Sequence, residues 1–196
     1  MIGNVVGWID LLSGIMACTA LLAVLSIVYR SWRNGIAPMP ASAPVRRQTA
    51  ELLRQLPAGG SVVEAGSGWG TLLLYVKRHC PDLAQIVGIE NSLVPYAVTR
   101  AAVLIERLTA RKHSRLNPSI AILRTDLYAH DYTQADAVGC YLYPGAMDRL
   151  GPILAEQLKP GSYVLSICFA IPGWRPERVV PCRELYRTPI YCYRVG

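Results

Sequence analysis

Three patterns of hydrophobic and polar positions follow one another along the chain, and each predicts a different structure. From Leu11 to Tyr29 nineteen consecutive residues carry no charge, and a helix of about that length crosses ~30 Å of hydrocarbon. Between residues 45 and 56 apolar side chains recur at helical spacing, with Arg and Gln between them. After the breaker PAGG at 57–60, short apolar runs alternate with helical segments.

The alternating region predicts an α/β domain. Strands are expected at 61–65, 84–90, 119–127, 135–143 and 162–171, and helices at 71–80, 92–111 and 146–158. Near-continuous apolar strands that alternate with helices indicate a mostly parallel sheet that helices cover on both faces. Residues 178–195 hold strand-like segments with no helix between them. We therefore expect an antiparallel C-terminal edge on this sheet.

We interpret the uncharged N-terminal run as a transmembrane anchor at residues 8–30. A signal peptide is the alternative, because ASA at 41–43 resembles a cleavage site. However, no basic residue precedes the run, and Asp10 is the one charged side chain before it. Arginines follow at positions 30, 33, 46 and 47. The positive-inside rule therefore predicts a single-pass protein with its N-terminus outside and its domain on the cytoplasmic or matrix-equivalent side.

A linker is expected between the anchor and the domain, at residues 31–44. Its segment NGIAPMPASAP is rich in Pro and Ala and cannot hold a long helix. The domain then spans residues 45–196. The six cysteines are scattered along the chain, with no CxxC and no paired Cys/His spacing. We therefore expect neither a metal site nor a disulfide framework.

The part of the chain that follows the anchor is strongly basic. The whole chain has 20 Lys and Arg against 13 Asp and Glu. All the basic residues lie at or after Arg30, together with 12 of the acids, so this part carries +8, from 20 − 12. The membrane bilayer, through its anionic lipids, is the simplest partner for this charge. Nucleic acid is not expected, because the densest basic stretch, at 106–117, has no interleaved aromatic residues.

A glycine loop follows the first strand of the domain. In VVEAGSGWGT, residues 62–71, the acid Glu64 precedes Gly66, Gly68 and Gly70. A dinucleotide fingerprint would require glycine at Thr71, and a P-loop would require a lysine after its last glycine. NAD and P-loop nucleotides are therefore disfavoured. The order of strand, acid and G-x-G-x-G resembles instead the cofactor loop of class I S-adenosylmethionine (SAM) dependent methyltransferases.

Further acids follow the next strands, at the sheet edge where ligands of such folds bind. Glu90 ends the second strand and is a candidate for the ribose hydroxyls, or for a cap of the following helix. Asp126 follows the third strand and is a candidate for the adenine amino group, or an ordinary turn acid. Glu64 is a candidate for orienting the loop or for facing the ligand's ammonium through water. The predicted cofactor site joins these acids to Gly66, Ser67, Gly68, Trp69, Gly70, Asn91 and Leu127.

Segments along nearly the whole chain resemble one narrower family. They are PAS at 40–42, EAGSGWG at 64–70, IVGIENS at 86–92, RTDLY at 124–128, YLYPGAMDRL at 141–150, VLSICFAIPGWRPE at 164–177 and IYCYRV at 190–195. With these segments in this order, the chain resembles the membrane-anchored protein-lysine methyltransferases that modify ATP synthase subunit c and the adenine nucleotide translocase, best known from mitochondria. The resemblance implies a Rossmann-like class I methyltransferase sheet, SAM as cofactor and lysine as acceptor.

Two positions depart from the pattern of those enzymes. They usually have Asp where this chain has Glu64, and an acid where it has Trp69. An aromatic ring at the second position either faces the sulfonium or the substrate cation, or closes over the first helix as a lid. Both interpretations of Trp69 stay open at the level of the sequence.

Methyl transfer to an amine is a direct displacement, so the enzyme mainly supplies alignment and a water-poor channel. The acceptor lysine must be neutral, and burial lowers its pKa from ~10.4. After the fourth strand, Tyr141 and Tyr143 are candidates to accept from the amine or to line its channel, although one of them is expected to be core packing. Pro144 stiffens the turn. Trp174 is either the opposite wall of the channel or a core aromatic.

The preferred hypothesis is a membrane-anchored SAM-dependent methyltransferase that acts on a lysine of a protein near the membrane. A second hypothesis is methylation of a lipid amine or a small molecule at the membrane, which the anchor and the basic charge suit equally well. A third is a non-catalytic SAM-binding scaffold.

Overall fold

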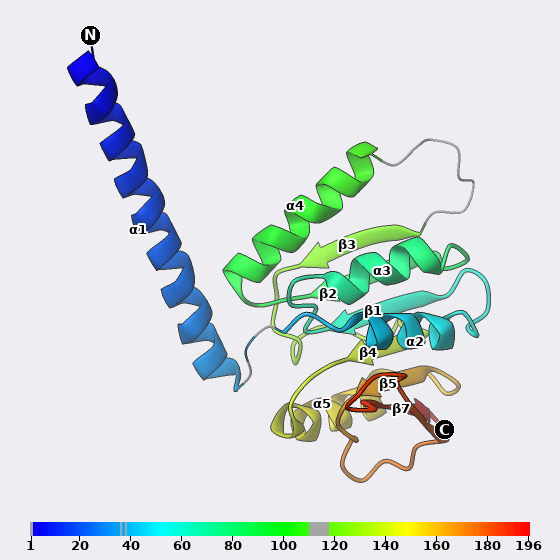
Figure 1. Ribbon diagram of the computed structural model, residues 1–196. Helices are drawn as coiled ribbons and strands as arrows, with labels where there is room; N and C mark the ends of the chain where they lie inside the picture. Colours follow the sequence, from blue (N-terminus) through cyan, green and yellow to red (C-terminus); the bar gives the residue numbers. More distant parts are fainter. Residues whose placement is uncertain (1, 36, 38, 110–117) are drawn as a thin grey trace. The chain divides into compact units, whose positions relative to one another are not determined.

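The computed structural model describes residues 2–35, 37, 39–109 and 118–196, which divide into two compact units, residues 1–37 and 38–196 (Figure 1). The first unit holds one helix, α1 (Ile2–Asn34). Within the described chain, its segment Trp8–Asn34 is the one stretch long and apolar enough to cross a membrane, and its most apolar part is not buried by other residues. Length and composition therefore agree with a single membrane span.

The second unit is built on a seven-stranded sheet in the order β3-β2-β1-β4-β5-β7-β6 (Figure 1). The strands are β1 (Ser61–Ala65), β2 (Gln85–Ile89), β3 (Ser119–Leu123), β4 (Ala137–Cys140), β5 (Tyr163–Ile167), β6 (Arg178–Pro181) and β7 (Pro189–Arg194). The first five pair in parallel, whereas β7 lies between β5 and β6 and is antiparallel to both. This confirms the predicted mostly parallel, Rossmann-like sheet with an antiparallel edge.

Helices cover the two faces of the sheet unequally. On one face α2 (Ala43–Leu53), α3 (Thr71–His79) and α4 (Leu93–Thr109) contribute to one apolar core, which includes Leu53, Leu73 and Val103. On the other face α5 (Pro144–Gln157) supplies the helical part of a second core, which includes Leu150 and Leu154. Because α5 is the one described helix in that second core, its buried side chains carry much of the cover for the central strands.

Several elements begin or end at residues whose local chemistry explains the boundary. Helix α2 begins at Ala43, inside the predicted linker, because the Ser42 hydroxyl accepts the N–H of Val45 and caps it. Helix α5 begins two residues earlier than predicted, at Pro144, since proline suits a first helical turn. The third strand ends earlier than predicted because Asp126 turns the chain. Residues 110 and 111 of the helix predicted at 92–111 lie outside the described residues.

Five parallel strands place their carboxyl ends at one edge of the sheet, and the strand order reverses between β1 and β4. The glycine loop leaves β1 at this edge, Glu90 leaves β2, and Tyr141 leaves β4. In sheets of this kind, ligands bind outside the carboxyl ends at the point of reversal. The topology therefore gathers the predicted site residues at one edge.

The unequal cover of the sheet predicts that the α5 core is sensitive to truncation. Leu154 is fully buried, and Leu154→Ala should lower the free energy of unfolding by about 2 to 5 kcal/mol. Chemical unfolding of the full chain in mild detergent, followed by near-ultraviolet circular dichroism, measures the change. Leu104→Ala is the matched control, because Leu104 on α4 is 55% exposed, and its effect should stay within about 0.5 kcal/mol. Equal losses for the two variants would contradict the packing described.

Candidate active site

The glycine loop between β1 and α3 has a backbone that few other residues can adopt. Gly66, Gly68 and Gly70 have φ values of 76, 51 and 68°, in the left-handed region that favours glycine. A Cβ on Gly66 would lie 2.8 Å from Cδ2 of Leu142, and one on Gly70 would overlap the side chain of Thr99. The spacing of the three glycines therefore follows from the path of the backbone.

Hydrogen bonds hold this loop in place from below. The N–H of Ser67 donates to the carbonyl of Ile89 over 2.8 Å, and the N–H of Gly70 donates to the carbonyl of Ser67 over 2.8 Å. The hydroxyl of Thr99, which is fully buried in α4, donates to the carbonyl of Gly68 over 3.1 Å. The loop is thus attached to β2 and to α4 as well as to its own strand.

Glu90 makes the central contacts beneath the loop. Its side chain is buried, and its two carboxylate oxygens accept the N–H of Gly68 over 2.9 Å and the N–H of Ser92 over 2.7 Å. The second contact is made to the residue before α4, so Glu90 fixes the turn that leads into this helix. A carboxylate has about four lone-pair sites, so Glu90 also retains the capacity to accept ligand hydroxyls. Its role toward ribose stays a prediction.

Glu64 lies in β1 just before the loop and is almost completely buried. The pKa of its carboxyl group is raised to about 8, first by burial and then by the charge of Glu90, while the Leu73 N–H in the first turn of α3 lowers it by donating to the carboxylate. At neutral pH the proton therefore stays on Glu64 as long as no cation lies beside it. A positive group beside it would reverse the balance.

Two buried polar atoms of the loop region have no hydrogen-bond partner within the described protein: Oε2 of Glu64 and Oγ of Ser67. A buried polar atom without a partner costs about 1 to 3 kcal/mol, and such atoms mark places where a ligand or water completes the site. Both atoms belong to the segment at 64–70, which the sequence predicts to bind SAM. The donors and acceptors present therefore fit a polar cofactor with an ammonium and hydroxyl groups.

The remaining predicted cofactor residues lie around the same edge. The Asp126 side chain is exposed and accepts the N–H of Tyr128 over 3.0 Å, so it does act as a turn acid. Leu127 is half-buried, and its Cδ2 would lie 4.0 Å from a Cβ on Gly66. Asn91 accepts the hydroxyl of Ser92 over 3.2 Å. Trp69 is half-buried in the loop itself.

The two candidate tyrosines pack on opposite faces of the sheet. Tyr141 packs against the α2–α3 core and Tyr143 against the α5 core, and both are partly exposed. Burial, and then the nearby Cys168, Glu184 and Cys182, raise the pKa of the Tyr141 phenol, which is therefore neutral at physiological pH. Because β4 ends at Cys140, the alternation of a strand does not extend to these tyrosines.

Pro144 and Trp174 complete the predicted substrate region. Pro144 is exposed in the first turn of α5. Trp174 is half-buried and meets Tyr193 edge-on, with ring centroids 5.6 Å apart. A Cβ on Gly151 of α5 would lie 3.7 Å from Nε1 of Trp174. The indole thus packs at the α5 core, which is the core role that the sequence left open.

The sequence missed two residues that shape the site. Thr99 fixes the loop from α4, and Leu142 closes over Gly66 from the segment after β4. Both stand in apolar runs whose periodicity indicates packing and nothing more. A buried threonine in an apolar helix is a weak signal by itself, because its hydroxyl commonly bonds within its own helix.

The raised pKa of Glu64 predicts a pH dependence of stability in the absence of cofactor. The folded protein holds this proton more tightly than the unfolded chain, so the stabilisation is complete below the unfolded value of 4.5 and is lost as the pH rises toward 8. The free energy of unfolding should fall across this window by a few kcal/mol more in the parent than in Glu64→Gln. Chemical unfolding of the full chain in mild detergent at several pH values measures both profiles. Parallel profiles would show that Glu64 ionises normally.

Comparison with known proteins identifies the family of this chain. The family described as ANTKMT methyltransferase domain matches residues 64–178, which include the glycine loop, Glu90 and both tyrosines. A protein-lysine N-methyltransferase of Saccharolobus islandicus is 30% identical over 159 residues, covering 81% of this chain and 92% of the relative. The mouse adenine nucleotide translocase lysine N-methyltransferase is 31% identical over 140 residues, covering 71% of this chain and 56% of the relative.

A solved structure supports both the fold and the cofactor. It is that of an RNA methyltransferase from Salinibacter ruber in complex with S-adenosyl-L-homocysteine, the demethylated form of SAM. Its TM-score is 0.67 at 27% identity, covering 81% of this chain and 94% of that chain. The glycine loop, the carboxylates beneath it and these relatives agree: the chain belongs to the ANTKMT methyltransferase domain family and is a SAM-dependent methyltransferase.

Proposed function

We propose that this protein is a membrane-anchored methyltransferase that moves a methyl group from SAM to a lysine amine of a protein at the membrane. The observation that carries the proposal is the loop from Glu64 to Gly70 on the carboxylate of Glu90, in a chain whose two relatives above are both named lysine N-methyltransferases. The membrane part of the proposal is supported by α1, which is long and apolar enough to cross a bilayer.

For the cofactor, we assign the polar atoms that the protein itself leaves available. SAM supplies a methyl group that its sulfonium makes electrophilic. Glu64 and Ser67 carry the unpartnered atoms Oε2 and Oγ, which suit the ammonium and carboxylate of its amino-acid part. Glu90 and Asn91 lie at the end of β2, where ribose hydroxyls bind in sheets of this kind. Asp126 and Leu127 follow β3, on the adenine side.

Trp69 extends this assignment at the loop, where its indole is half-buried. An aromatic face beside a cation contributes about 0.5 to 2 kcal/mol, the higher value when water is excluded. We assign Trp69 to the cationic part of the cofactor or of the approaching amine. Similar enzymes carry an acid at this position, whose negative charge attracts a cation. In this chain the face of the Trp69 ring would provide the attraction instead.

For the acceptor, the two tyrosines after β4 offer oxygen atoms at the same edge. A lysine reacts only as a free amine, so the site must take up its neutral form. The Tyr141 phenol adds no negative charge at physiological pH, since its own pKa is raised, and a neutral phenol does not favour the ammonium form of a neighbour. A phenol oxygen accepts a hydrogen bond from the amine and orients its lone pair. We assign this positioning role to one of the two, Tyr141 or Tyr143, with Pro144 stiffening the turn.

The membrane part of the proposal depends on α1 and on charge. The arginines after the apolar segment and the +8 of the residues that follow it favour an arrangement with the domain on the cytoplasmic or matrix-equivalent side. The mouse relative is named for the adenine nucleotide translocase, and the present chain spans 56% of its length. These features support a membrane protein as the methyl acceptor.

Incubation with radiolabelled SAM and membranes from cells that lack the protein tests the proposed acceptor. We expect label in a membrane protein band, and hydrolysis of that band should release methylated lysine. Glu90→Gln should lose most of the labelling, because its amide cannot accept both N–H groups of the loop and α4. Glu156→Gln is the matched control, since Glu156 is an exposed acid on α5, and it should label like the parent.

Other outcomes of the same experiment would contradict the proposal. Label in the lipid extract would show that the acceptor is a lipid amine. Label in a small molecule would show that the acceptor is a small molecule. Label in RNA would show that the acceptor is RNA, as the name of the Salinibacter ruber RNA methyltransferase says of that protein. Binding of S-adenosyl-L-homocysteine without transfer to any fraction would indicate a scaffold.

A further inference from the structure

The loop between β6 and β7 exposes two large hydrophobic side chains. Leu185 is 90% exposed and Tyr186 is 85% exposed, the two highest values among the large hydrophobic residues described. Arg183 and Arg187 flank them in the sequence RELYR. Two adjacent exposed apolar side chains of this size form a patch of the kind that meets a membrane or another protein.

Internal hydrogen bonds hold this loop in shape. The N–H of Cys182 donates to the carbonyl of Thr188 over 2.9 Å, and the N–H of Arg187 donates to the carbonyl of Glu184 over 3.0 Å. The Thr188 hydroxyl donates to the carboxylate of Glu184. Arg187 adopts φ 47°, which closes the turn. The apolar tip is therefore presented by a built turn.

The entry of the chain into the domain lies beside this loop. The Ser42 hydroxyl donates to Oε2 of Glu184 over 2.8 Å, and the N–H of Ala41 donates to the hydroxyl of Thr71 over 3.2 Å. The β6–β7 loop is therefore bonded directly to the segment through which the chain enters the domain.

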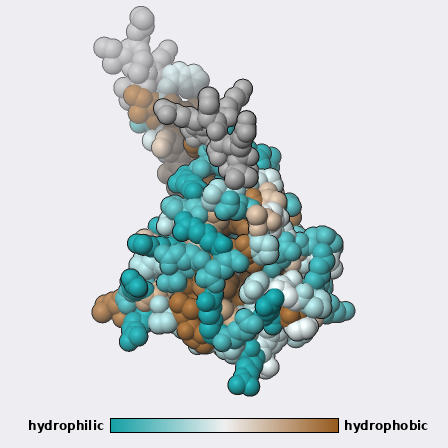
Figure 2. Space-filling model, turned by 90° about the vertical axis from the view of Figure 1, so that its right-hand side faces the viewer, coloured by the Kyte–Doolittle hydropathy of each residue, from teal (hydrophilic) through white to brown (hydrophobic). Residues whose placement is uncertain are grey.

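The loop also lies at the edge of the sheet that carries the site. Ile167 at the end of β5 pairs with Ile190, and Pro181 at the end of β6 pairs with Pro189. The connection between β6 and β7 therefore leaves from the carboxyl edge, like the glycine loop and the tyrosines. The other edge, which carries the amino ends of the parallel strands, is mostly hydrophilic in Figure 2, with smaller hydrophobic patches.

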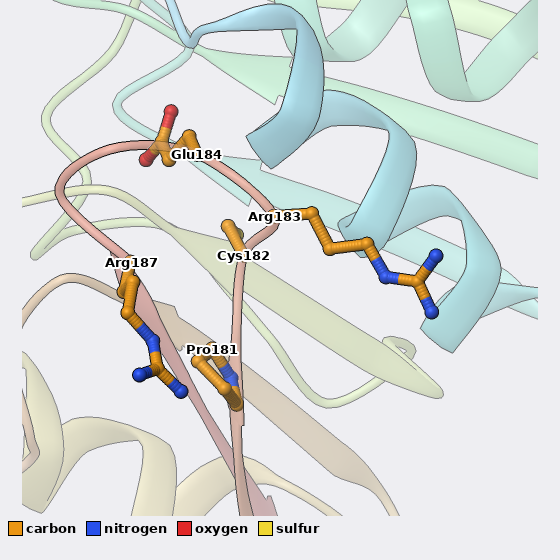
Figure 3. A pocket seen from close by; sticks show the side chains of 5 residues that line it. All are labelled: Pro181, Cys182, Arg183, Glu184 and Arg187. Atoms are coloured by element: carbon orange, nitrogen blue, oxygen red, sulfur yellow. The ribbon is translucent and has the colours of Figure 1, made fainter.

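The chemistry of the loop suits the interface of a lipid bilayer. Tyrosine is enriched at that level because its ring is apolar and its hydroxyl is polar. The loop borders a hollow of about 480 Å³ lined by Pro181, Cys182, Arg183, Glu184 and Arg187. In Figure 3 the side chain of Arg187 points back along the hairpin, away from its bend, and that of Arg183 points away from the hairpin. Positive groups set back from an apolar tip match a layer of anionic head groups above hydrocarbon.

We propose that Leu185 and Tyr186 insert into the bilayer interface, with Arg183 and Arg187 at the head groups, and that this contact turns the carboxyl edge of the sheet toward the membrane. The inference rests on the proposed membrane anchoring and deepens it. An anchor alone leaves the domain free to rotate on its linker, whereas a second contact fixes which side meets the bilayer. The site would then open where a membrane protein presents its lysine.

The test places a tryptophan at the tip and one at another exposed apolar position. Tyr186→Trp and Leu104→Trp are made in the full chain, reconstituted into vesicles of phosphatidylcholine and phosphatidylserine with brominated or unbrominated acyl chains. Brominated lipid quenches tryptophans that reach the acyl chains, and subtraction of the parent removes the native tryptophans. We expect clear additional quenching for Tyr186→Trp and less for Leu104→Trp on α4. Arg183→Gln with Arg187→Gln should reduce the quenching at position 186.

Quenching at position 104 equal to or greater than that at 186 would overturn the inference, and so would no quenching at 186. Normal binding of S-adenosyl-L-homocysteine by each variant shows that it folds. No methyl acceptor is present, so the result is independent of lysine methylation. Flotation of the parent with the same vesicles tests the anchor separately. A parent that fails to float refutes the anchoring, whereas a floating protein without quenching at 186 refutes the docked loop alone.

Discussion

The carboxylate of Glu90 connects the parts of the protein on which its chemistry depends. It accepts one N–H from the glycine loop and one from the residue before α4, so β1, β2 and α4 meet at a single buried group. Thr99 adds a second bond between α4 and the loop. A buried carboxylate is stable only when such donors surround it, and here the donors include the backbone N–H groups of Gly68 and Ser92.

Glu64, by contrast, lacks a hydrogen-bond partner for one of its two oxygens, although it lies close to Glu90. It has one backbone donor and one oxygen with no partner, and burial keeps its proton in place. The two carboxyl groups thus differ: Glu90 holds the loop, whereas Glu64 keeps one oxygen unpartnered, which we propose for the ammonium of the cofactor. Environment rather than residue type assigns these roles, since both side chains are glutamates at the ends of neighbouring strands.

The elements that leave the carboxyl edge of the sheet bear on the membrane orientation that we propose. The glycine loop, the tyrosines after β4 and the loop between β6 and β7 all leave from the carboxyl edge. The chain enters the domain at this edge too, through Ala41 and Ser42. The apolar helix α1 and the basic charge favour a membrane, and the apolar tip of the β6–β7 loop favours the carboxyl edge as the side that we propose to meet it. That orientation would open the site toward a membrane-bound acceptor.

Periodicity predicted most of the fold, because alternating strands and helices leave a strong pattern in the sequence. The order of elements and the antiparallel edge followed from apolar runs and breakers. The spacing of Gly66, Gly68 and Gly70 disfavoured NAD and P-loop nucleotides, and the resemblance of the loop to that of class I methyltransferases implied SAM. Two contacts could not be predicted: that of Thr99 with the glycine loop and that of Ser42 with Glu184. They join residues far apart in the chain, and short polar side chains carry no periodic signal. The different sides taken by Tyr141 and Tyr143 depend on where β4 ends, which periodicity locates least precisely.

Proton release on cofactor binding tests the central claim most directly, namely that Glu64 and Glu90 form the receiving side of the SAM site. Titration calorimetry with S-adenosyl-L-homocysteine at pH 7, in buffers of different ionisation enthalpy, measures it for the full chain in mild detergent. Since the pKa of Glu64 is about 8 without a ligand, binding of the ammonium should release more protons in the parent than in Glu64→Gln. Equal proton release in the two proteins would contradict this account of the site.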